Sequence, residues 1–117
     1  MQPKIIIYQK PTCSKCREAL KLLRESGHDF ESINYYETPF TISDLHGLLK
    51  KLRLSARDLL RRNESIARTL GIRPEEVTKA ELVELMVQHP DLIQRPIVVR
   101  GRKAVLGRPP ENVKTLL

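Results

Sequence analysis

The fold is decided by one stretch near the start of the chain, Ile5-Ile6-Ile7-Tyr8-Gln9-Lys10-Pro11-Thr12-Cys13-Ser14-Lys15-Cys16. Its first four residues form an apolar run bounded by prolines, which predicts a buried β-strand. After the turn at Pro11, apolar residues continue at helical spacing: Cys16, Ala19, Leu20 and Leu23. This spacing predicts a helix with one buried face, which Gly27 would end. The stretch therefore carries two cysteines from the end of a strand into the first turn of a helix.

The segments that follow complete an α/β pattern. Residues 30–35 predict a second strand, parallel to the first because a helix connects the two. Residues 96–99 and 104–106 predict a β-hairpin around Gly101, and a short helix follows it. The order strand, helix, strand, helices, hairpin, helix predicts a thioredoxin-like fold. In that fold a four-stranded mixed sheet receives a helical insertion between its second strand and the hairpin.

The insertion is predicted over about residues 41–92. Helix-capping patterns begin at Thr41, Ser55 and Thr78, and apolar residues at helical spacing follow each of them. The third of these helices would turn three side chains inward: Leu82, Leu85 and Met86. No linker, repeat or low-complexity tract interrupts the chain, so residues 1–117 are predicted to form a single domain.

Composition narrows the class of protein. The chain has 117 residues and a formal net charge of +7, from 21 Lys and Arg against 14 Asp and Glu. The basic residues are dispersed, with no polybasic tail and no aromatic stacking motif, so direct nucleic-acid binding is not favoured. An anionic small substrate or an acidic partner protein fits this charge at least as well.

The compartment is predicted from what the sequence lacks. No apolar stretch is long enough to cross a membrane, and the first residues are too short and polar for a secretory signal. A cytoplasmic, reducing location is therefore expected. In such a compartment a cysteine pair is more plausibly catalytic or regulatory than a permanent disulfide.

The two cysteines, Cys13 and Cys16, are the only ones in the chain and form a C-x-x-C motif. A helix N-terminus favours the thiolate, so Cys13 is predicted to be a reactive nucleophile. Cys16, one turn further, is either a resolving cysteine that attacks a Cys13 adduct or a small core residue. No metal site is predicted, because zinc would need a second pair of ligands and the three histidines are scattered.

Three arginines stand at the ends of predicted elements, where loops meet. Arg61 ends a predicted helical segment, Arg95 precedes the proline that opens the hairpin, and Arg108 follows the second strand of the hairpin. The planar guanidinium donates paired hydrogen bonds and stays charged, which suits a tetrahedral oxyanion. If these loops converge on the cysteine turn, the arginines would lower the thiol pKa and hold an anionic substrate. The alternative is that each arginine is an ordinary surface charge.

Several short motifs occur in the order of one known family. They are Pro11-x-Cys13, Leu59-Leu60-Arg61-Arg62-Asn63, Gln88-His89-Pro90, Arg95-Pro96-Ile97-Val98-Val99 and Gly107-Arg108-Pro109. With these motifs, the chain resembles the glutaredoxin-coupled arsenate reductases and their relatives, which include the Spx transcription regulators. The resemblance runs from about residue 4 to the C-terminus.

The resemblance implies a thiol-dependent arsenate reductase. Cys13 would form the adduct with arsenate, and Arg61, Arg95 and Arg108 would bind the oxyanion. Pro96 would follow a cis peptide bond and face the cysteine turn. Glutathione as co-substrate, with glutaredoxin or thioredoxin as partner, would supply the electrons. No tightly bound cofactor, no membrane and no direct nucleic-acid contact is implied.

The sequence departs from the family pattern at two positions. Gln9 stands where the reductases commonly have a histidine that depresses the cysteine pKa, so the helix N-terminus and the arginines would have to supply that effect. Cys16 is absent from many glutaredoxin-coupled members and resembles the C-x-x-C switch of the Spx proteins. Two alternatives therefore stay open, a Spx-like regulator that binds RNA polymerase and a generic thiol oxidoreductase. Arg108 and Arg61 favour the reductase over the regulator.

Overall fold

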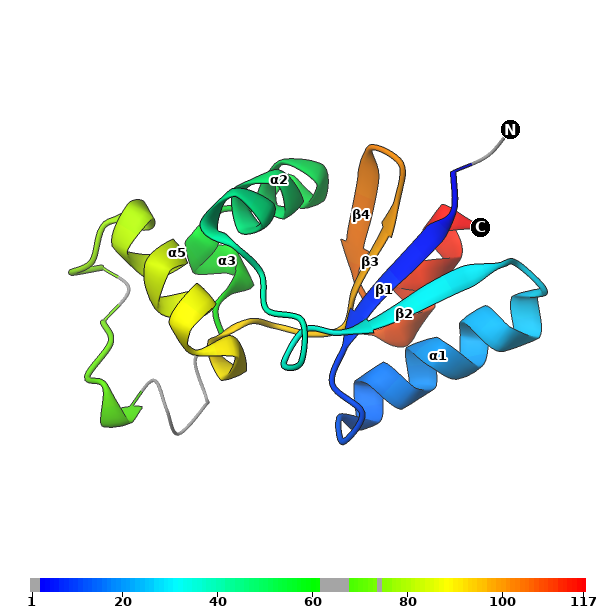
Figure 1. The fold of residues 1–117 in the computed structure, drawn as a ribbon, viewed down its shortest axis with the longest axis horizontal. Helices are drawn as coiled ribbons and strands as arrows, with labels where there is room; N and C mark the ends of the chain where they lie inside the picture. Colours follow the sequence, from blue (N-terminus) through cyan, green and yellow to red (C-terminus); the bar gives the residue numbers. More distant parts are fainter. Residues whose placement is uncertain (1–2, 62–67, 74) are drawn as a thin grey trace. The chain divides into compact units, whose positions relative to one another are not determined.

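The computed structural model describes residues 3–61, 68–73 and 75–117 (Figure 1). The chain divides into two compact units. Met1–Thr38 and Arg95–Leu117 form the sheet unit, and Pro39–Gln94 form the helical unit. The helical unit includes residues 41–92, over which the insertion was predicted, and the single domain of residues 1–117 stays a prediction.

The sheet unit holds one four-stranded sheet with the order β2-β1-β3-β4. Its strands are β1 Ile5–Gln9, β2 Phe30–Asn34, β3 Ile97–Arg100 and β4 Lys103–Leu106. β1 and β2 are parallel, whereas β3 is antiparallel to both β1 and β4. This mixed sheet with its helical insertion confirms the predicted thioredoxin-like α/β fold.

One face of the sheet is covered by two helices that lie side by side, α1 Ser14–Ser26 and the 3₁₀ helix η2 Pro110–Leu116 (Figure 1). Alternate residues of β1 face them, because side chains in a strand alternate between the two faces. The core formed there consists of Ile5, Ile7, Ala19, Leu23, Val98, Val113 and Leu116. α1 ends as predicted at Gly27, whose φ of +77° suits glycine.

The helical unit contains α2 Ile42–Leu52, α3 Ala56–Leu59, α5 Lys79–Gln88 and the 3₁₀ helix η1 Pro90–Leu92. All three predicted caps are confirmed as complete capping boxes, at Thr41, Ser55 and Thr78. In each of them the side chain three residues later accepts a hydrogen bond from the cap's backbone N–H.

Two details of the helical unit differ from the prediction. On α5, Leu82 and Met86 are buried as expected, but Val83 is buried in place of Leu85, which is half-buried. The second difference concerns the segment before Arg61, which was predicted as helical to its end. α3 stops at Leu59, and the next residue pairs with Ile93 as an isolated bridge. Among the described residues, no helix is long and apolar enough to cross a membrane.

Candidate active site

One end of the sheet gathers the predicted site residues of the sheet unit. β1 and β2 are parallel, so both finish at this end, and in the register Tyr8 lies opposite Ile97, which lies opposite Leu106. β3 therefore begins, and β4 finishes, at the same end. The loops that meet there carry Cys13 after β1, Tyr35 and Tyr36 after β2, Arg95 and Pro96 before β3, and Arg108 after β4.

Cys13 is the N-cap residue of α1, as the sequence predicted. Its backbone N–H donates to the Lys10 carbonyl oxygen at 3.0 Å, which closes the turn between strand and helix. Its Sγ accepts a hydrogen bond from the Cys16 backbone N–H at 3.4 Å. The sulfur thus takes the place that a serine or aspartate oxygen usually occupies at a helix start, where unpaired N–H groups favour a negative charge.

The pKa of Cys13 lies below its ordinary value of 9.0. Burial alone would raise this pKa, because the side chain is only 9% exposed and the thiolate loses water. Hydrogen bonds from the thiol and backbone N–H of Cys16 lower it, and so do the charge and hydrogen bonding of Arg95. The net result favours a thiolate at this position, which is the reactive form of cysteine.

Cys16 behaves in the opposite way. It is fully buried, with 0% of its surface exposed, and burial raises its pKa to about 12. The neighbouring Cys13 side chain adds to this rise, whereas the Lys10 backbone and Arg95 oppose it. The pKa values of two cysteines three residues apart are therefore shifted in opposite directions. Both are free thiols.

Arg95 is the charged side chain that most lowers the pKa of Cys13. It is only 7% exposed, and its Nη1 donates to the Tyr36 hydroxyl at 3.4 Å. Its buried Nε has no hydrogen-bond partner in the part of the chain that the structure describes. Burial lowers the pKa of Arg95, but Tyr35, Tyr36 and Cys13 raise it above its ordinary value, so the guanidinium stays charged. A buried guanidinium with an unpaired N–H donor can bind an anion.

Arg108 supports Arg95 from the neighbouring loop. Its Nε donates to the Arg95 carbonyl oxygen at 2.7 Å. Arg108 is itself held by Asn112, whose Nδ2 donates to the Arg108 carbonyl oxygen at 3.1 Å. The structure thus brings the loops of Arg95 and Arg108 together, and that the Arg108 guanidinium reaches Cys13 stays a prediction. Arg108 is not among the groups that most strongly shift the pKa of Cys13.

Pro96 follows a cis peptide bond, as the family resemblance implied. Its carbonyl oxygen accepts the Gly107 N–H at 2.8 Å, so the two loops are joined directly. A Cβ at Gly107 would lie 2.6 Å from the Pro96 ring, which explains why a glycine precedes Arg108. That Pro96 faces the cysteine turn stays a prediction.

Arg61 belongs to the helical unit. Its backbone N–H donates to the Leu92 carbonyl oxygen at 2.7 Å, beside the bridge between Leu60 and Ile93. This contact lies within the helical unit, whereas Cys13 belongs to the sheet unit, so the predicted meeting of Arg61 with the cysteine stays a prediction. Residues 62 and 63 of the same motif lie outside the described residues.

Gln9, at the end of β1, occupies the position where the resemblance led us to expect a histidine. It is buried, and its Nε2 donates to the Ser32 hydroxyl at 3.0 Å. Its Oε1 has no hydrogen-bond partner among the described residues. Gln9 is not among the groups that most strongly shift the pKa of Cys13, which depends on burial, Cys16 and Arg95.

The tyrosine pair after β2 was missed by sequence reasoning. Tyr35 is buried, which raises its pKa to about 12, and the nearby Arg95 opposes this rise. The rings of Tyr35 and Tyr36 are 5.0 Å apart, and the Lys10 ammonium lies 4.7 Å from the centre of the Tyr36 ring. A usable signal was present, because both tyrosines directly follow the carboxyl end of a strand parallel to β1.

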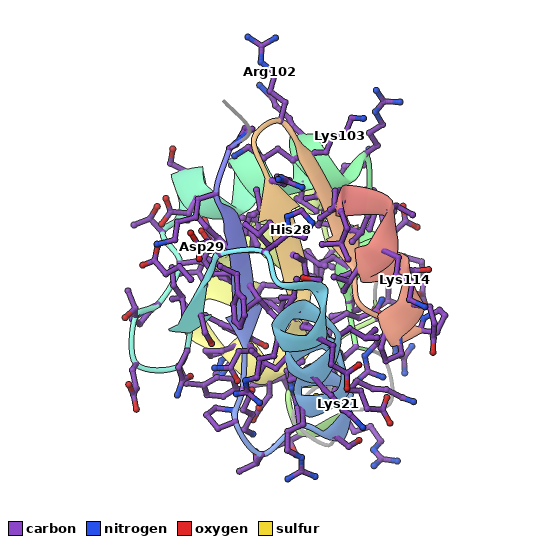
Figure 2. All side chains as sticks on the ribbon, turned by 90° about the vertical axis from the view of Figure 1, so that its right-hand side faces the viewer. Lys21, His28, Asp29, Arg102, Lys103 and Lys114 are labelled. Atoms are coloured by element: carbon purple, nitrogen blue, oxygen red, sulfur yellow. The ribbon has the colours of Figure 1, made fainter. Side chains whose placement is uncertain are left out.

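Some charged residues of the sheet unit lie on its surface. Figure 2 shows Arg102 at the turn of the β3–β4 hairpin and Lys114 on η2, both pointing outward. Arg17, although close to Cys13 in sequence, is exposed. Among the residues that the structure describes, no group of three His, Cys, Asp or Glu side chains is placed to hold a metal ion.

Comparison with known proteins agrees with this geometry. The family model described as ArsC family matches residues 8–116. The chain belongs to the ArsC family. An arsenate reductase of Neisseria meningitidis is 39% identical over 116 residues, covering 98% of this chain and 99% of the relative. The protein of Escherichia coli K12 called uncharacterized protein YfgD is 43% identical over 114 residues, covering 97% of this chain and 96% of the relative.

The fold of this ArsC-family chain also matches solved structures. The arsenate reductase from Vibrio cholerae superposes with a TM-score of 0.94 at 36% identity, covering 100% of both chains. Neither this structure nor the two relatives above is named as a transcription regulator, so they lend no support to the Spx-like alternative.

Proposed function

We propose that this protein is an arsenate reductase in which the Cys13 thiolate attacks arsenate. The observation that supports the proposal most strongly is the pairing of Cys13 with Arg95. The cysteine has a lowered pKa at a helix N-terminus, and the Nε of the buried arginine beside it has no hydrogen-bond partner in the described part of the chain. Relatives named arsenate reductase over nearly the full length point to the same substrate.

Arsenate would bind as a dianion or monoanion against the guanidinium of Arg95. The planar fork of arginine donates two parallel hydrogen bonds to such an oxyanion and stays charged at all working pH values. The family resemblance adds Arg108, Arg61 and Pro96 to the proposed oxyanion site. The helix N-terminus contributes a positive potential at the reacting sulfur.

The reaction then takes two steps at Cys13. A sulfur lone pair forms the S–As bond while one As–O bond breaks, and the departing hydroxide takes up a proton and leaves as water. A second thiolate attacks the Cys13 sulfur, forms a disulfide and breaks the S–As bond. The electron pair of that bond stays on arsenic, which passes from As(V) to As(III) and leaves as arsenite.

The second thiolate is proposed to come from glutathione, and glutaredoxin would reduce the resulting mixed disulfide. Cys16 is the internal candidate, in which case thioredoxin or glutaredoxin would reduce a Cys13–Cys16 disulfide. Its raised pKa makes Cys16 a slow nucleophile until it loses its proton. Mass spectrometry after one turnover without reductase separates the two routes, by a glutathione adduct on Cys13 or by an internal disulfide.

The proposed function is tested by coupled turnover. Purified protein is given arsenate, glutathione, glutaredoxin, glutathione reductase and NADPH, and a parallel series replaces the glutathione components with thioredoxin and its reductase. We expect arsenite formation that Cys13→Ser lowers by at least about 10³-fold, since removing a nucleophile removes the covalent route. Arsenite formation that persists in Cys13→Ser excludes the proposed nucleophile. If the wild type forms no arsenite with either donor series, the protein is not an arsenate reductase.

A further inference from the structure

A tyrosine holds one edge of the Arg95 guanidinium. The Nη1 amino group donates to the Tyr36 hydroxyl at 3.4 Å. In any arginine, Nε–H and Nη2 lie together on the opposite edge, and this pair forms the fork that grips carboxylates and similar anions side-on. On that edge, the buried Nε has no partner among the described residues. Tyr36 therefore contacts the half of the guanidinium that the anion does not need.

Tyr36 is itself fixed in place. Its backbone N–H donates to the Asn34 Oδ1 at 3.0 Å, in the turn that ends β2. The Asn34 carbonyl oxygen accepts two further N–H groups, from Glu37 at 3.1 Å and Thr38 at 3.0 Å. The ring packs at 5.0 Å from the Tyr35 ring and lies below the Lys10 ammonium at 4.7 Å. Because the ring is constrained, its hydroxyl is a hydrogen-bond acceptor of fixed position for the flexible Arg95 side chain.

The ring also links Arg95 to the nucleophile. Lys10, whose ammonium lies over the Tyr36 ring, accepts the Cys13 backbone N–H with its carbonyl oxygen at 3.0 Å. Arg108 holds the Arg95 backbone, not its guanidinium. The Tyr36 hydroxyl, by contrast, contacts the guanidinium itself. Arginine side chains lose considerable rotamer freedom when they bind, and a contact formed beforehand removes part of that cost.

We propose that Tyr36 is a positioning residue for Arg95, holding Nη1 so that the Nε and Nη2 edge is presented to the oxyanion beside Cys13. The inference rests on the proposed function, because it assigns the anion to the arsenate site. It adds a residue that was not predicted from the sequence. The ligand held by Arg95 is a tetrahedral oxyanion, and the test below uses arsenate as the probe.

The test compares Tyr36→Phe with the wild type. Phenylalanine keeps the ring, and with it the contacts to Tyr35 and Lys10, but removes the hydroxyl. We expect KM for arsenate to rise about threefold to tenfold with kcat nearly unchanged, as for the loss of one hydrogen bond to a charged group. Tyr8→Phe is the matched control, since Tyr8 is the only tyrosine outside the pair. It should leave KM unchanged.

A second readout does not need turnover. Arsenate should protect Cys13 from alkylation by iodoacetamide, located by peptide mass spectrometry, and Tyr36→Phe should weaken this protection by the same factor. The same substitution in an Arg95→Ala background should have no further effect, because a residue that acts through Arg95 has nothing left to orient. A merely structural role would weaken both backgrounds equally.

The outcomes separate this inference from the proposed function. Arsenate protection that depends on Tyr36 only when Arg95 is present supports the inference, even if the wild type reduces no arsenate and the proposed function fails. Normal turnover with an unchanged KM and protection in Tyr36→Phe overturns the inference alone. An equal loss in the Arg95→Ala background also overturns it, as does a wild type in which arsenate gives no protection.

Discussion

Arg95 and Arg100 flank the same strand, β3, and use their guanidinium groups in opposite ways. Arg100, at the end of β3, donates from Nη1 to the Leu116 carbonyl oxygen at 2.6 Å and from Nε to the Pro3 carbonyl oxygen at 3.1 Å. Arg95, just before β3, donates from Nη1 to a tyrosine hydroxyl and keeps a buried Nε without a partner among the described residues. Both are arginines beside an apolar strand.

The difference is the one expected between a structural arginine and the binding arginine that we propose Arg95 to be. Arg100 satisfies backbone acceptors at both ends of the chain, so its donors stabilise the fold. Arg95 is more deeply buried, yet it leaves a donor unsatisfied, which costs stability unless a ligand completes it. A protein tolerates that cost where the donor is needed for binding. Mutating the two residues should therefore affect different properties.

The largest effect is expected at Arg95. Arg95→Ala should lower kcat/KM for arsenate by about 10²- to 10³-fold, as for the removal of one charged donor from an oxyanion site. Circular dichroism should show that the fold is retained. The variant should also raise the pKa of Cys13, because Arg95 lowers it in the native protein. Titrating the alkylation rate of Cys13 against pH measures this change.

Arg95→Lys is the matched variant that separates charge from geometry. Lysine keeps the positive charge but lacks the planar fork, so we expect the Cys13 pKa to stay low while KM for arsenate rises. If both Arg95 variants kept wild-type kinetics, the proposed oxyanion role of Arg95 would be wrong.

At Arg100, the effect should appear in stability. Arg100→Ala should lower the free energy of unfolding by about 1–3 kcal/mol, because two hydrogen bonds from a charged group are lost. Arg102→Ala is the control. It removes an exposed arginine from the hairpin turn (Figure 2) and should change stability by less than about 0.5 kcal/mol. Urea denaturation measures both, and kcat/KM should stay at the wild-type value in each. A loss of activity without a loss of stability in Arg100→Ala would show that Arg100 is not a purely structural arginine.

The sequence predicted the fold well because its signals are local. Each capping box joins a side chain and a backbone group only three residues apart, as in Thr41 with Asp44. The parallel pairing of β1 and β2 follows from the helix between them, and that of β3 and β4 from the tight turn at Gly101. The caps and these strand pairings can therefore be predicted from neighbouring residues and the segments that connect the strands.

The site was predicted only in part, because its contacts are distant in sequence. Cys13, Arg95 and Arg108 were found because they adjoin strands, where loops of this fold meet. The hydrogen bond from Arg95 to Tyr36 joins residues 59 positions apart, and no sequence pattern announces it. Nor does the sequence tell Arg95 from Arg100, because the difference lies in which acceptors the fold brings to each guanidinium. The third arginine, Arg61, lies in the helical unit and stays a predicted member of the site.

The smallest effect concerns the two cysteines, which repeat the contrast between a site group and a core group. The unfolded Cys16 thiol loses its proton near pH 9.0, whereas the folded one keeps it up to about pH 12. Between these values the folded protein binds more protons than the unfolded one, so this group makes the free energy of unfolding fall as pH rises. From pH 9 to 10 the contribution is at most about 1 kcal/mol.

Cys16→Ser should remove this alkaline loss, measured as the difference in unfolding free energy between pH 9 and pH 10 against the wild type under reducing conditions. Cys13→Ser is the matched control. The Cys13 pKa is lowered on folding, so its contribution to stability rises with pH and levels off above 9.0, opposite in sign to that of Cys16. Because burial is the largest cause of the raised Cys16 pKa, the alkaline loss should persist in Cys13→Ser. An alkaline loss that is equal in Cys16→Ser and the wild type would mean that Cys16 ionises in the folded protein and is not the core group described above.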